Sequence, residues 1–379
     1  MRVAIDATSL LDRPTGVGVF TRELVDGLAA VRDAEGLDLS VFAVSWRGRD
    51  GLAGAVPPGV AVRARPVPAR LARPLWARSD HPSAAWLGGR ADVVHGPNHV
   101  VPPGGGAAEV VTVHDLTAVH FPELCTPDVR AWPALLDRAV QRGAWIHTPT
   151  RFVADEARQR WPAAAARVVA IPHGLRRPPE VDAATAAAQA AAGARLAGAE
   201  RYVLALGTVE PRKDLVGLVA AFDAVAAELD DVVLVIAGPD GWGTDEFVAA
   251  WEASPFRRRI RRIGWIDAAA RTALTRGASV VAYPSRYEGF GFVPLEALAV
   301  GTPVVATAVG AVEEVTGDAA VLVPPGDRDA LADALRAVLV DPGSVAVTDR
   351  LARGRVRLDA LTWDRATAGF VDLYRRASG

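Results

Sequence analysis

Two glutamates separated by seven residues, Glu288 and Glu296, could bind a polyhydroxylated molecule. The first stands in a glycine-rich loop, Tyr-Glu-Gly-Phe-Gly-Phe, and the second falls in the helical pattern that follows. Carboxylates are strong hydrogen-bond acceptors, so the pair could bind the vicinal hydroxyls of a sugar or a ribose. Backbone N–H groups around Gly289, Phe290 and Gly291 could hold phosphate or hydroxyl oxygens. Either glutamate alone would also suit a helix N-terminus.

The loop from Gly207 to Asp214, Gly-Thr-Val-Glu-Pro-Arg-Lys-Asp, contains Lys213, the single lysine among 42 basic residues. In a composition this rich in arginine, a retained lysine indicates a need for a compact ammonium group. Arg212 and Lys213 are expected at a helix start, where positive charge opposes the helix dipole. A diphosphate between the cations and the helix would remove that conflict. The loop therefore predicts an anion site, with a solvated surface position as the alternative.

A further glycine pair, Gly16 and Gly18, follows the first apolar run and precedes a helical pattern. Glycines there let the backbone approach an anion at a helix N-terminus. The segment lacks the third glycine of a dinucleotide fingerprint and the Gly-Lys-Ser/Thr of a P-loop, so a plain turn is equally compatible.

No metal site is expected. His95 and His99 are separated by Gly-Pro-Asn, so no helix would present both as ligands. The Asp327-Arg-Asp329 segment precedes an apolar-periodic helix, and this position is typical of helix capping.

The composition is that of an ordinary globular protein of two domains. The 379 residues are 50% hydrophobic and 23% charged, and the formal net charge of −2 gives no bias toward nucleic acid. A single cysteine permits no internal disulfide, so nothing points to an oxidising compartment. No apolar stretch reaches the roughly 18 residues of a membrane span, and the N-terminus is expected to form a strand rather than a signal peptide. We therefore expect a cytoplasmic protein.

Short valine-rich runs alternate with segments of helical period, which predicts βαβ units around parallel sheets. Strands are expected at 2–5, 39–44, 92–95, 110–113, 145–148, 168–171, 202–206, 232–237, 279–283, 303–307 and 320–323. Helices are expected at 18–31, 126–143, 215–229, 268–276, 294–300 and 328–339. Two doubly wound units account for this order better than one very large sheet.

The domain boundary is expected in the alanine-rich stretch 176–200, which contains no strand-like run and is interpreted as a linker plus a helix. Residues 1–175 would form the first domain and 201–361 the second. A last helix over 362–379, capped by Thr362, would pack back on the first domain.

Five arginines and no acidic residue lie between Asp50 and Asp80. An irregular solvated loop is one interpretation of this stretch. The alternative is contact with an anionic acceptor or an anionic membrane surface.

The chain closely resembles the retaining family 4 glycosyltransferases, within the glycosyl transferases group 1. The resemblance is carried by PSRYEGFGFVPLEALAVGTPVVAT, with GTVEPRKD before it and EEVTGDAAVLVPPGD after it. It extends to IDATSLLDRPTGVGVFTREL and VVTVHDLTAVHFPE, and so covers nearly the whole chain. The resemblance implies the α/β fold called GT-B, in which two Rossmann-like doubly wound parallel-sheet domains face a central crevice.

The same resemblance implies roles in donor binding and catalysis for residues of the second half. Glu296 would bind the ribose hydroxyls, and Glu288 would contact the donor sugar or its phosphate side. Arg212 and Lys213, in the loop that begins at Gly207, would neutralise the diphosphate of the donor. Many members have an arginine where this chain has Thr208, so Arg212 is expected to supply that charge.

The remaining residues implied by the resemblance lie in three loops. The backbone of Gly264, Trp265 and Ile266 matches the segment that cradles the base. His114 in Val-His-Asp is similar to a residue that points into the catalytic crevice, where it would orient the donor sugar. Gly16 and Gly18 match the loop beside the phosphate or the acceptor.

The implied reaction is a metal-independent, retaining transfer of a hexose from a nucleotide sugar, with GDP-mannose favoured and UDP-glucose next. The nucleotide sugar is a substrate, so no cofactor is expected. The expected partners are the nucleotide-sugar donor and a glycan or lipid-linked acceptor. Peripheral contact with anionic lipid at the inner face of the cell membrane is also expected. No nucleic-acid partner is expected.

Three alternatives remain open. A sugar-nucleotide epimerase on the same fold would turn over the donor without an acceptor. A pyridoxal-phosphate phosphorylase with Lys213 as its Schiff base would carry a visible chromophore. A non-catalytic nucleotide-binding protein would bind the nucleotide without turnover.

Overall fold

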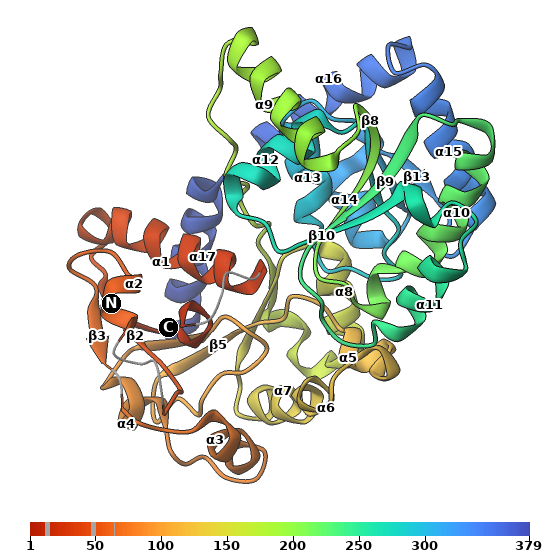
Figure 1. Cartoon of the computed structure of the whole chain (residues 1–379). Helices are drawn as coiled ribbons and strands as arrows, with labels where there is room; N and C mark the ends of the chain where they lie inside the picture. Colours follow the sequence, from red (N-terminus) through yellow and green to blue (C-terminus); the bar gives the residue numbers. More distant parts are fainter. Residues whose placement is uncertain (12–15, 47–50, 64) are drawn as a thin grey trace. The chain divides into compact units, whose positions relative to one another are not determined.

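The computed structural model describes residues 1–11, 16–46, 51–63 and 65–379, and it divides into two α/β units (Figure 1). Unit 1 comprises Met1–Gly174 together with Leu361–Gly379, and unit 2 comprises Leu175–Ala360. Where the chain leaves unit 1, a Cβ on Gly174 would lie 2.3 Å from the backbone nitrogen of Trp363. The exit from unit 1 and the return to it are therefore in direct contact.

The described residues of unit 1 form a seven-stranded parallel sheet in the order β3-β2-β1-β4-β5-β6-β7. The strands are β1 (Arg2–Asp6), β2 (Asp38–Phe42), β3 (Ala61–Arg63), β4 (Val93–Gly96), β5 (Ala108–Thr112), β6 (Trp145–Thr148) and β7 (Val168–Ala170). The helices are α1 (Gly16–Glu35), α2 (Leu52–Ala55), α3 (Ala69–Trp76), α4 (Ala84–Gly88), α5 (Thr117–His120), α6 (Pro127–Arg130), α7 (Trp132–Gln141), α8 (Arg151–Arg160) and α17 (Trp363–Ser378).

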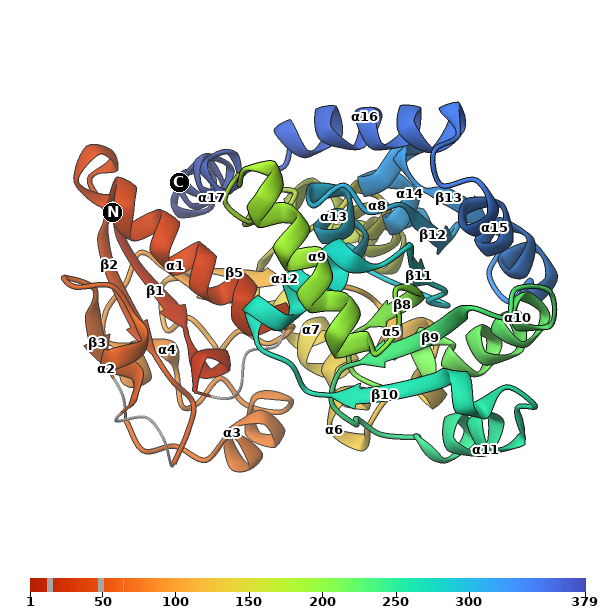
Figure 2. The ribbon, with the colours of Figure 1, turned by 45° about the horizontal axis from the view of Figure 1, so that its top comes forward.

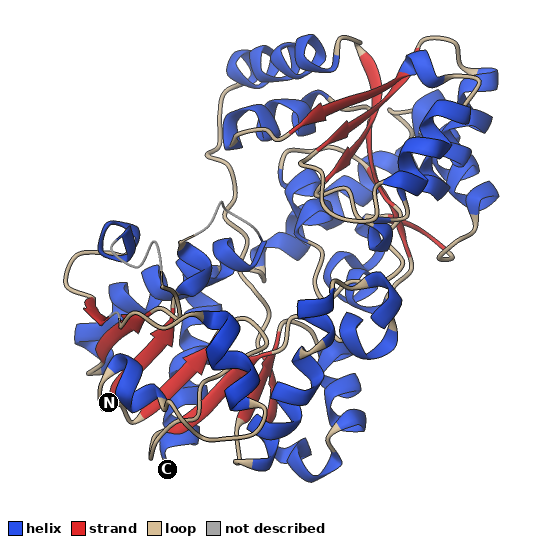
Figure 3. Ribbon diagram, turned by 60° about the horizontal axis from the view of Figure 1, so that its bottom comes forward, coloured by secondary structure: helices blue, strands red, loops and turns tan. Residues whose placement is uncertain are grey.

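Helices cover the sheet of unit 1, and its central strands are buried (Figure 3). Phe20 and Leu24 recur at helical spacing on α1 and pack with Phe370 of α17 against β1. Figure 2 shows α1 and α17 near each other, and the two helices are in contact. Thr362 caps α17 as expected, because its hydroxyl accepts a hydrogen bond of 3.3 Å from the Arg365 N–H.

The described residues of unit 2 form a six-stranded parallel sheet in the order β10-β9-β8-β11-β12-β13. The strands are β8 (Arg201–Leu206), β9 (Val232–Ala237), β10 (Ile260–Gly264), β11 (Val280–Tyr283), β12 (Val304–Thr307) and β13 (Val321–Val323). The helices are α9 (Ala183–Ala197), α10 (Leu215–Glu228), α11 (Asp245–Ala253), α12 (Ala268–Gly277), α13 (Phe292–Ala299), α14 (Gly310–Thr316), α15 (Arg328–Val340) and α16 (Val345–Asp359). The prediction of two doubly wound parallel sheets is thus confirmed.

The structure departs from the sequence prediction at several places, and it contains helices that were not predicted, among them α8, α11, α14 and α16. The helix expected over 126–143 is two helices, α6 and α7, because Pro133 lies at the start of the second. The stretch expected as an irregular loop contains β3 and α3. Strand β10 was not predicted, because Arg261 and Arg262 interrupt its apolar pattern at the sheet edge.

The Asp-x-Asp segment caps a helix, as expected. A side-chain oxygen of Asp327 accepts a hydrogen bond of 2.9 Å from the N–H of Ala330 at the start of α15. Within the ranges that the structure describes, no group of three or more histidine, cysteine or acidic side chains is arranged to hold a metal ion. In the same ranges, no helix has both the length and the apolarity to span a bilayer.

A chain of buried hydrogen bonds ties the last helix to the sheet of unit 1. His147 Nε2 lies 3.0 Å from the Ile171 carbonyl, which can only accept, so the proton is on that nitrogen. Thr112 then donates to His147 Nδ1 at 2.9 Å, and His95 Nε2 donates to Thr112 at 2.8 Å. The Tyr374 hydroxyl completes the chain by donating to His95 Nδ1 at 2.7 Å. These directions are those of neutral imidazoles, the form that burial favours because it lowers the pKa of both His95 and His147.

Replacing Tyr374 with phenylalanine should lower the free energy of unfolding by about 1–3 kcal/mol, because His95 Nδ1 stays buried without its donor. Urea unfolding measures the change. Arg375→Ala, in the next residue, is the control: its ion pair with Glu35 joins two partly exposed side chains and should contribute less than about 1 kcal/mol. Equal losses in the two variants would contradict this prediction.

Candidate functional site

The order of the strands in unit 2 reverses between β8 and β11, and ligands of open α/β sheets bind beyond the strand ends at such a switch point. The loop with Arg212 and Lys213 follows β8, and the loop with Glu288 follows β11. The topology therefore brings together residues that lie about 75 positions apart in the sequence.

Arg212 and Lys213 occupy a short 3-10 turn, Pro211–Lys213, and not the helix start that the sequence suggested. Asp214 separates this turn from α10 and has a left-handed backbone, with φ of 47°. Such a conformation is costly for a residue with a Cβ. Arg286, in the loop after β11, forms an ion pair of 3.0 Å with the Asp214 carboxylate. This ion pair ties the turn to the loop that contains Glu288.

Glu288 lies between the two predicted cations. Its Oε1 is 2.6 Å from Lys213 Nζ, and its Oε2 is 2.6 Å from a terminal nitrogen of Arg212. The other terminal nitrogen of Arg212 is 2.7 Å from Glu210. Only 9% of the Glu288 side chain is exposed. We name these four residues, Glu210, Arg212, Lys213 and Glu288, the cation cluster.

The cation cluster keeps its charges although it is buried. Burial by itself would raise the pKa of Glu288, but the charges of Arg212 and Lys213 outweigh it and hold that pKa well below its usual range. Burial lowers the pKa of Lys213, and the Glu288 carboxylate opposes this change. Glu288 is thus ionised near neutral pH, and its ion pairs with Arg212 and Lys213 hold the three side chains in place.

Tyr283 belongs to the same site, although sequence reasoning gave it no role. Its hydroxyl accepts a hydrogen bond of 3.1 Å from Lys213 Nζ, and the ammonium lies 4.6 Å from the centre of its ring. Burial, followed by the nearby Glu288 charge, raises the pKa of Tyr283 well above its ordinary value. The only sequence signal was its position at the end of a predicted strand.

Glycines let three strand ends meet beside the cation cluster. Gly207 and Gly238 have φ of 131° and 154°, and the Gly238 N–H donates to the Gly264 carbonyl at 2.7 Å. A Cβ on Gly238 would lie 1.9 Å from the Gly207 carbonyl oxygen, so only glycine fits there. Trp265 and Ile266 follow Gly264, and Trp265 is 56% exposed.

The loop after Glu288 turns sharply into α13. Gly291 precedes the helix with φ of 104°, which disfavours any side chain at that position. Phe290 is buried, and its ring lies 4.9 Å from that of Phe292. Gly289 and Phe290 thus connect the cation cluster to the first turn of α13.

Glu296 does not share the partners of Glu288. Its Oε2 accepts from Arg271 of α12, with the Nε and one terminal nitrogen of the guanidinium at 2.7 and 2.5 Å. Burial raises the pKa of Glu296, and Arg271 opposes this change. Arg271 was missed by sequence reasoning, because only the packing of α12 on α13 brings it to Glu296.

The predicted residues of unit 1 lie at the corresponding edge of the other sheet. His114 donates from Nε2 to the Pro97 carbonyl at 2.7 Å, so Nδ1 is its acceptor nitrogen. Burial lowers the pKa of His114, which favours the neutral imidazole. Gly16 and Gly18 belong to the first turn of α1 and not to a preceding loop, and residues 12–15 of that motif lie outside the described residues.

A cavity of about 240 Å³ lies at the switch point between β1 and β4 of unit 1. Its lining includes Asp6, Arg73 and Trp76. Asn98 and Trp132 also line it, with a buried amide oxygen and a buried indole N–H that have no hydrogen-bond partner among the described residues. A hydroxyl group can accept from the indole and donate to the amide oxygen. The lining therefore suits a ligand that carries a hydroxyl group.

Two family models together match most of the chain: "Glycosyltransferase Family 4" over residues 14–176 and "Glycosyl transferases group 1" over residues 190–354. The chain belongs to the group 1 glycosyltransferases. This glycosyltransferase is 29% identical to the O-antigen chain mannosyltransferase B of Escherichia coli over 291 residues, which is 75% of this chain and 74% of the relative. It is 38% identical to a phosphatidyl-myo-inositol mannosyltransferase of Mycobacterium leprae over 195 residues, which is 50% of this chain and 49% of the relative, so the match spans about half of that protein.

Solved structures agree with the fold of the glycosyltransferase. A sucrose-phosphate synthase from Thermosynechococcus elongatus superposes with a TM-score of 0.75 over 99% of this chain and 98% of its own, at 22% sequence identity. The prediction of a group 1 glycosyltransferase with the two Rossmann-like domains of the GT-B fold is thus confirmed.

Proposed function

We propose that this glycosyltransferase moves a hexose, with mannose favoured, from a nucleoside-diphosphate sugar to a hydroxyl of a glycan or lipid-linked acceptor, with retention and without a metal ion. The observation that carries the proposal is the cation cluster, in which Arg212 and Lys213 are held within 2.6 Å of Glu288 beside the glycine-rich strand ends. GDP-mannose is the favoured donor because the relatives most similar in sequence include two mannosyltransferases, and UDP-glucose is next.

The cation cluster supports the departure of the diphosphate. As the bond between the anomeric carbon and the phosphate oxygen breaks, its electron pair goes to that oxygen, which becomes more negative. Arg212 and Lys213 would stabilise this charge from fixed positions, a contribution of a few kcal/mol for each group in a site with little water. Glu288 keeps both cations in position before the donor arrives.

Retention follows if the acceptor attacks from the side that the diphosphate leaves. The acceptor oxygen then forms the new bond to the anomeric carbon, and its proton passes to the departing phosphate oxygen. Glu296 would bind the ribose, and the backbone of Gly264 and its two neighbours would cradle the base. His114 would accept a hydrogen bond from a donor-sugar hydroxyl through Nδ1, because its Nε2 proton is held by the Pro97 carbonyl.

The cavity of unit 1 is the proposed acceptor site, and α3 suggests a lipid-linked acceptor. Arg73 and Trp76 of α3 line the cavity, whereas Leu71 and Leu75 of the same helix are 58% and 50% exposed. Exposed leucines beside arginines are typical of a helix that lies on an anionic bilayer. One short helix would thus contact the acceptor head group with one side and the bilayer with the other.

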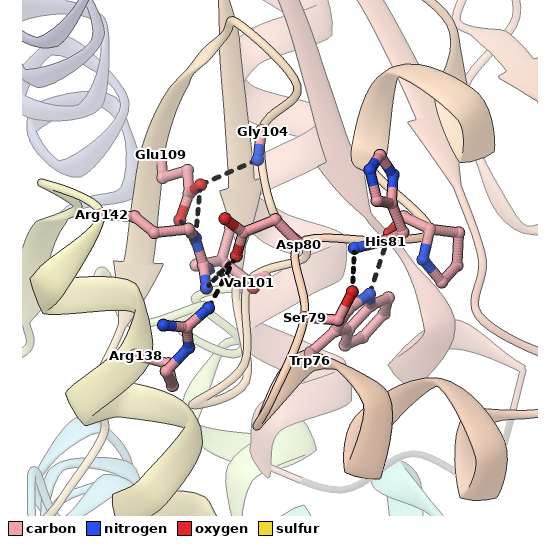
Figure 4. A network of polar contacts seen from close by, with 10 residues as sticks. Trp76, Ser79, Asp80, His81, Val101, Gly104, Glu109, Arg138 and Arg142 are labelled. Carbon is pink, nitrogen blue, oxygen red and sulfur yellow. Dashed lines mark hydrogen bonds and ion pairs between the residues drawn. The ribbon is translucent and has the colours of Figure 1, made fainter.

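Polar contacts fix the segment that follows α3 (Figure 4). Trp76 donates from its indole to the Pro82 carbonyl at 2.8 Å. Asp80 is 3.0 Å from Arg138 of α7, and Arg142 joins Asp80 to Glu109 of β5 at 3.7 and 2.8 Å. These contacts fix the end of α3 and the segment up to Pro82 beside α7 and β5.

A thermal-shift screen with GDP, UDP, ADP and their sugar conjugates tests the donor. GDP and GDP-mannose are expected to raise the unfolding midpoint, because a molecule that binds only the native state stabilises it. The shift should be the same with Mg²⁺ and with a chelator, since the cation cluster supplies the positive charge. A preference for UDP would change the donor, and no shift with any nucleotide at millimolar concentration would reject the proposed function.

Sedimentation with liposomes tests the bilayer contact. Binding to anionic vesicles should fall at least about tenfold in a variant with Leu71 and Leu75 changed to serine and Arg70 and Arg78 to alanine, because each basic residue near the surface contributes about 1 kcal/mol. Leu196→Ser, an exposed leucine of unit 2, is the matched control. Binding that is equal in all three proteins, or absent in the wild type, would contradict the contact.

A further inference from the structure

The carboxylate of Glu296 is held asymmetrically. Both guanidinium contacts from Arg271, at 2.7 and 2.5 Å, fall on Oε2. No described residue contacts Oε1 at hydrogen-bond distance, although the side chain is only 31% exposed. One oxygen is therefore fixed by the protein, and the other is left as an acceptor in a partly buried position.

The protein fixes Arg271 itself from both ends of α12. Asp267 caps the helix by accepting from the Ala270 N–H at 2.8 Å, and its carbonyl accepts from the Arg271 N–H at 2.9 Å. Further along the helix, the Thr275 hydroxyl donates to the Arg271 carbonyl at 2.7 Å. The guanidinium thus extends from a rigid backbone.

Arg271 gives the carboxylate two properties. Charge-assisted contacts to one oxygen hold the side chain in one rotamer, which an unpaired glutamate would lose. The positive charge also opposes the burial that raises the pKa of Glu296, and so favours the ionised form. An ionised carboxylate with a fixed orientation is a stronger acceptor for a hydroxyl than a mobile or protonated one.

We propose that Arg271 is a positioning residue for ribose recognition. It binds Oε2 of Glu296 and so orients Oε1 to accept hydrogen bonds from the ribose hydroxyls of the donor nucleotide. The proposal rests on the proposed function, in which Glu296 binds the ribose. Arg271 acts through Glu296 and not by touching the nucleotide. Its removal should therefore weaken only the part of the affinity that depends on ribose hydroxyls.

Calorimetric titration with GDP, 2′-deoxy-GDP and 3′-deoxy-GDP, or the UDP series where UDP binds more tightly, tests the proposal. In the wild type, loss of the recognised hydroxyl should raise Kd about tenfold or more, as expected for a hydrogen bond to a charged group. The quantity compared is the Kd of the deoxy nucleotide divided by the Kd of the ribose nucleotide. In Arg271→Ala this ratio should fall to less than about threefold, while the Kd of the deoxy nucleotide stays near its wild-type value. Arg271→Lys keeps the positive charge but loses the two guanidinium contacts to Oε2, so the ratio of the two Kd values should be intermediate.

Three comparisons make the result decisive. Glu296→Gln should reduce the same ratio, and adding Arg271→Ala to it should change the ratio no further. Arg276→Ala, on the same helix but bonded to Gln189 at 2.9 Å, should behave as the wild type. Thermal midpoints confirm that every variant is folded.

The outcomes separate this inference from the proposed function. If Arg271→Ala weakens ribose and deoxyribose forms equally, Arg271 contacts the nucleotide directly and the positioning role is wrong. If the ratio stays at its wild-type value, Arg271 has no part in ribose recognition. If the wild type binds no nucleoside diphosphate at all, the proposed function fails first and the inference falls with it.

Discussion

Lys213→Ala is expected to lower kcat for release of the nucleoside diphosphate about 10²–10³-fold. The ammonium is held 2.6 Å from Glu288 and 3.1 Å from the Tyr283 hydroxyl, so it is in place before the leaving group becomes charged. Removing one such preorganised group typically costs a few kcal/mol in the transition state. Some stability should be lost as well, because Arg212 must then neutralise both Glu210 and Glu288. The variant's thermal midpoint therefore has to show that it is folded at the temperature of the assay.

Two variants show whether the effect belongs to the site. Lys213→Arg keeps the charge but replaces a compact ammonium with a planar fork, so we expect a loss of about tenfold. Arg201→Ala breaks an ion pair with Asp231 at the opposite end of β8 and should leave kcat unchanged. Full activity in Lys213→Ala would remove the cation cluster from the mechanism.

Unit 1 is expected to unfold in mild acid while unit 2 stays folded. Burial lowers the pKa of His99 and His147 to about 3, and it holds that of His95 and His173 well below the ordinary value. The unfolded chain binds these protons near pH 6.5 and the native state does not, so stability falls as the pH drops below 6.5. At pH 5 the two histidines with a pKa of about 3, His99 and His147, cost about 2 kcal/mol each, and the burial of His95 and His173 acts in the same direction. This is a large fraction of the stability of a typical domain.

Unit 2 is the internal control, because none of the seven histidines of the chain falls within it. Hydrogen exchange resolved by peptide, between pH 7 and 4.5, should show β4, β5 and β6 losing protection before β8 and β9. His120→Gln removes a partly exposed imidazole and should not move the transition. Simultaneous loss of protection in both units, or none above pH 4.5, would show that the buried histidines do not control acid stability.

The sequence predicted the fold where the strands are buried on both faces. Runs such as Val232–Ala237 are continuously apolar, because helices cover both faces of a parallel sheet. The prediction missed β3 and β10, which lie at the sheet edges, where exposure weakens the apolar pattern. Helix α3 was missed for a related reason: it buries only Ala72 and Trp76, and its exposed face carries arginines and leucines together.

The candidate site was predictable as a set of loops but not as a set of contacts. Glycines, carboxylates and the single lysine after predicted strands marked the loops that contain Lys213 and Glu288. The sequence suggested that Glu288 and Glu296 bind one ligand as a pair, whereas in the structure Glu288 pairs with Arg212 and Lys213 and Glu296 pairs with Arg271. Arg271 and Tyr283 had no motif to mark them, because their roles arise only when α12 and β11 pack beside the loops.

The contact between Gly174 and Trp363 has a consequence for the order in which the protein is made. Unit 1 needs α17, whose Tyr374 supplies the donor for His95, yet α17 is synthesised only after the whole of unit 2. At about 5–20 residues per second, the first 174 residues wait roughly 10 to 40 seconds while 175–360 emerge from the ribosome. The second unit, which is continuous in the chain, can therefore finish folding before the first, and the nascent sheet of unit 1 exposes the groove for α17 throughout that interval. Chaperone dependence of this protein should accordingly be a property of its N-terminal half.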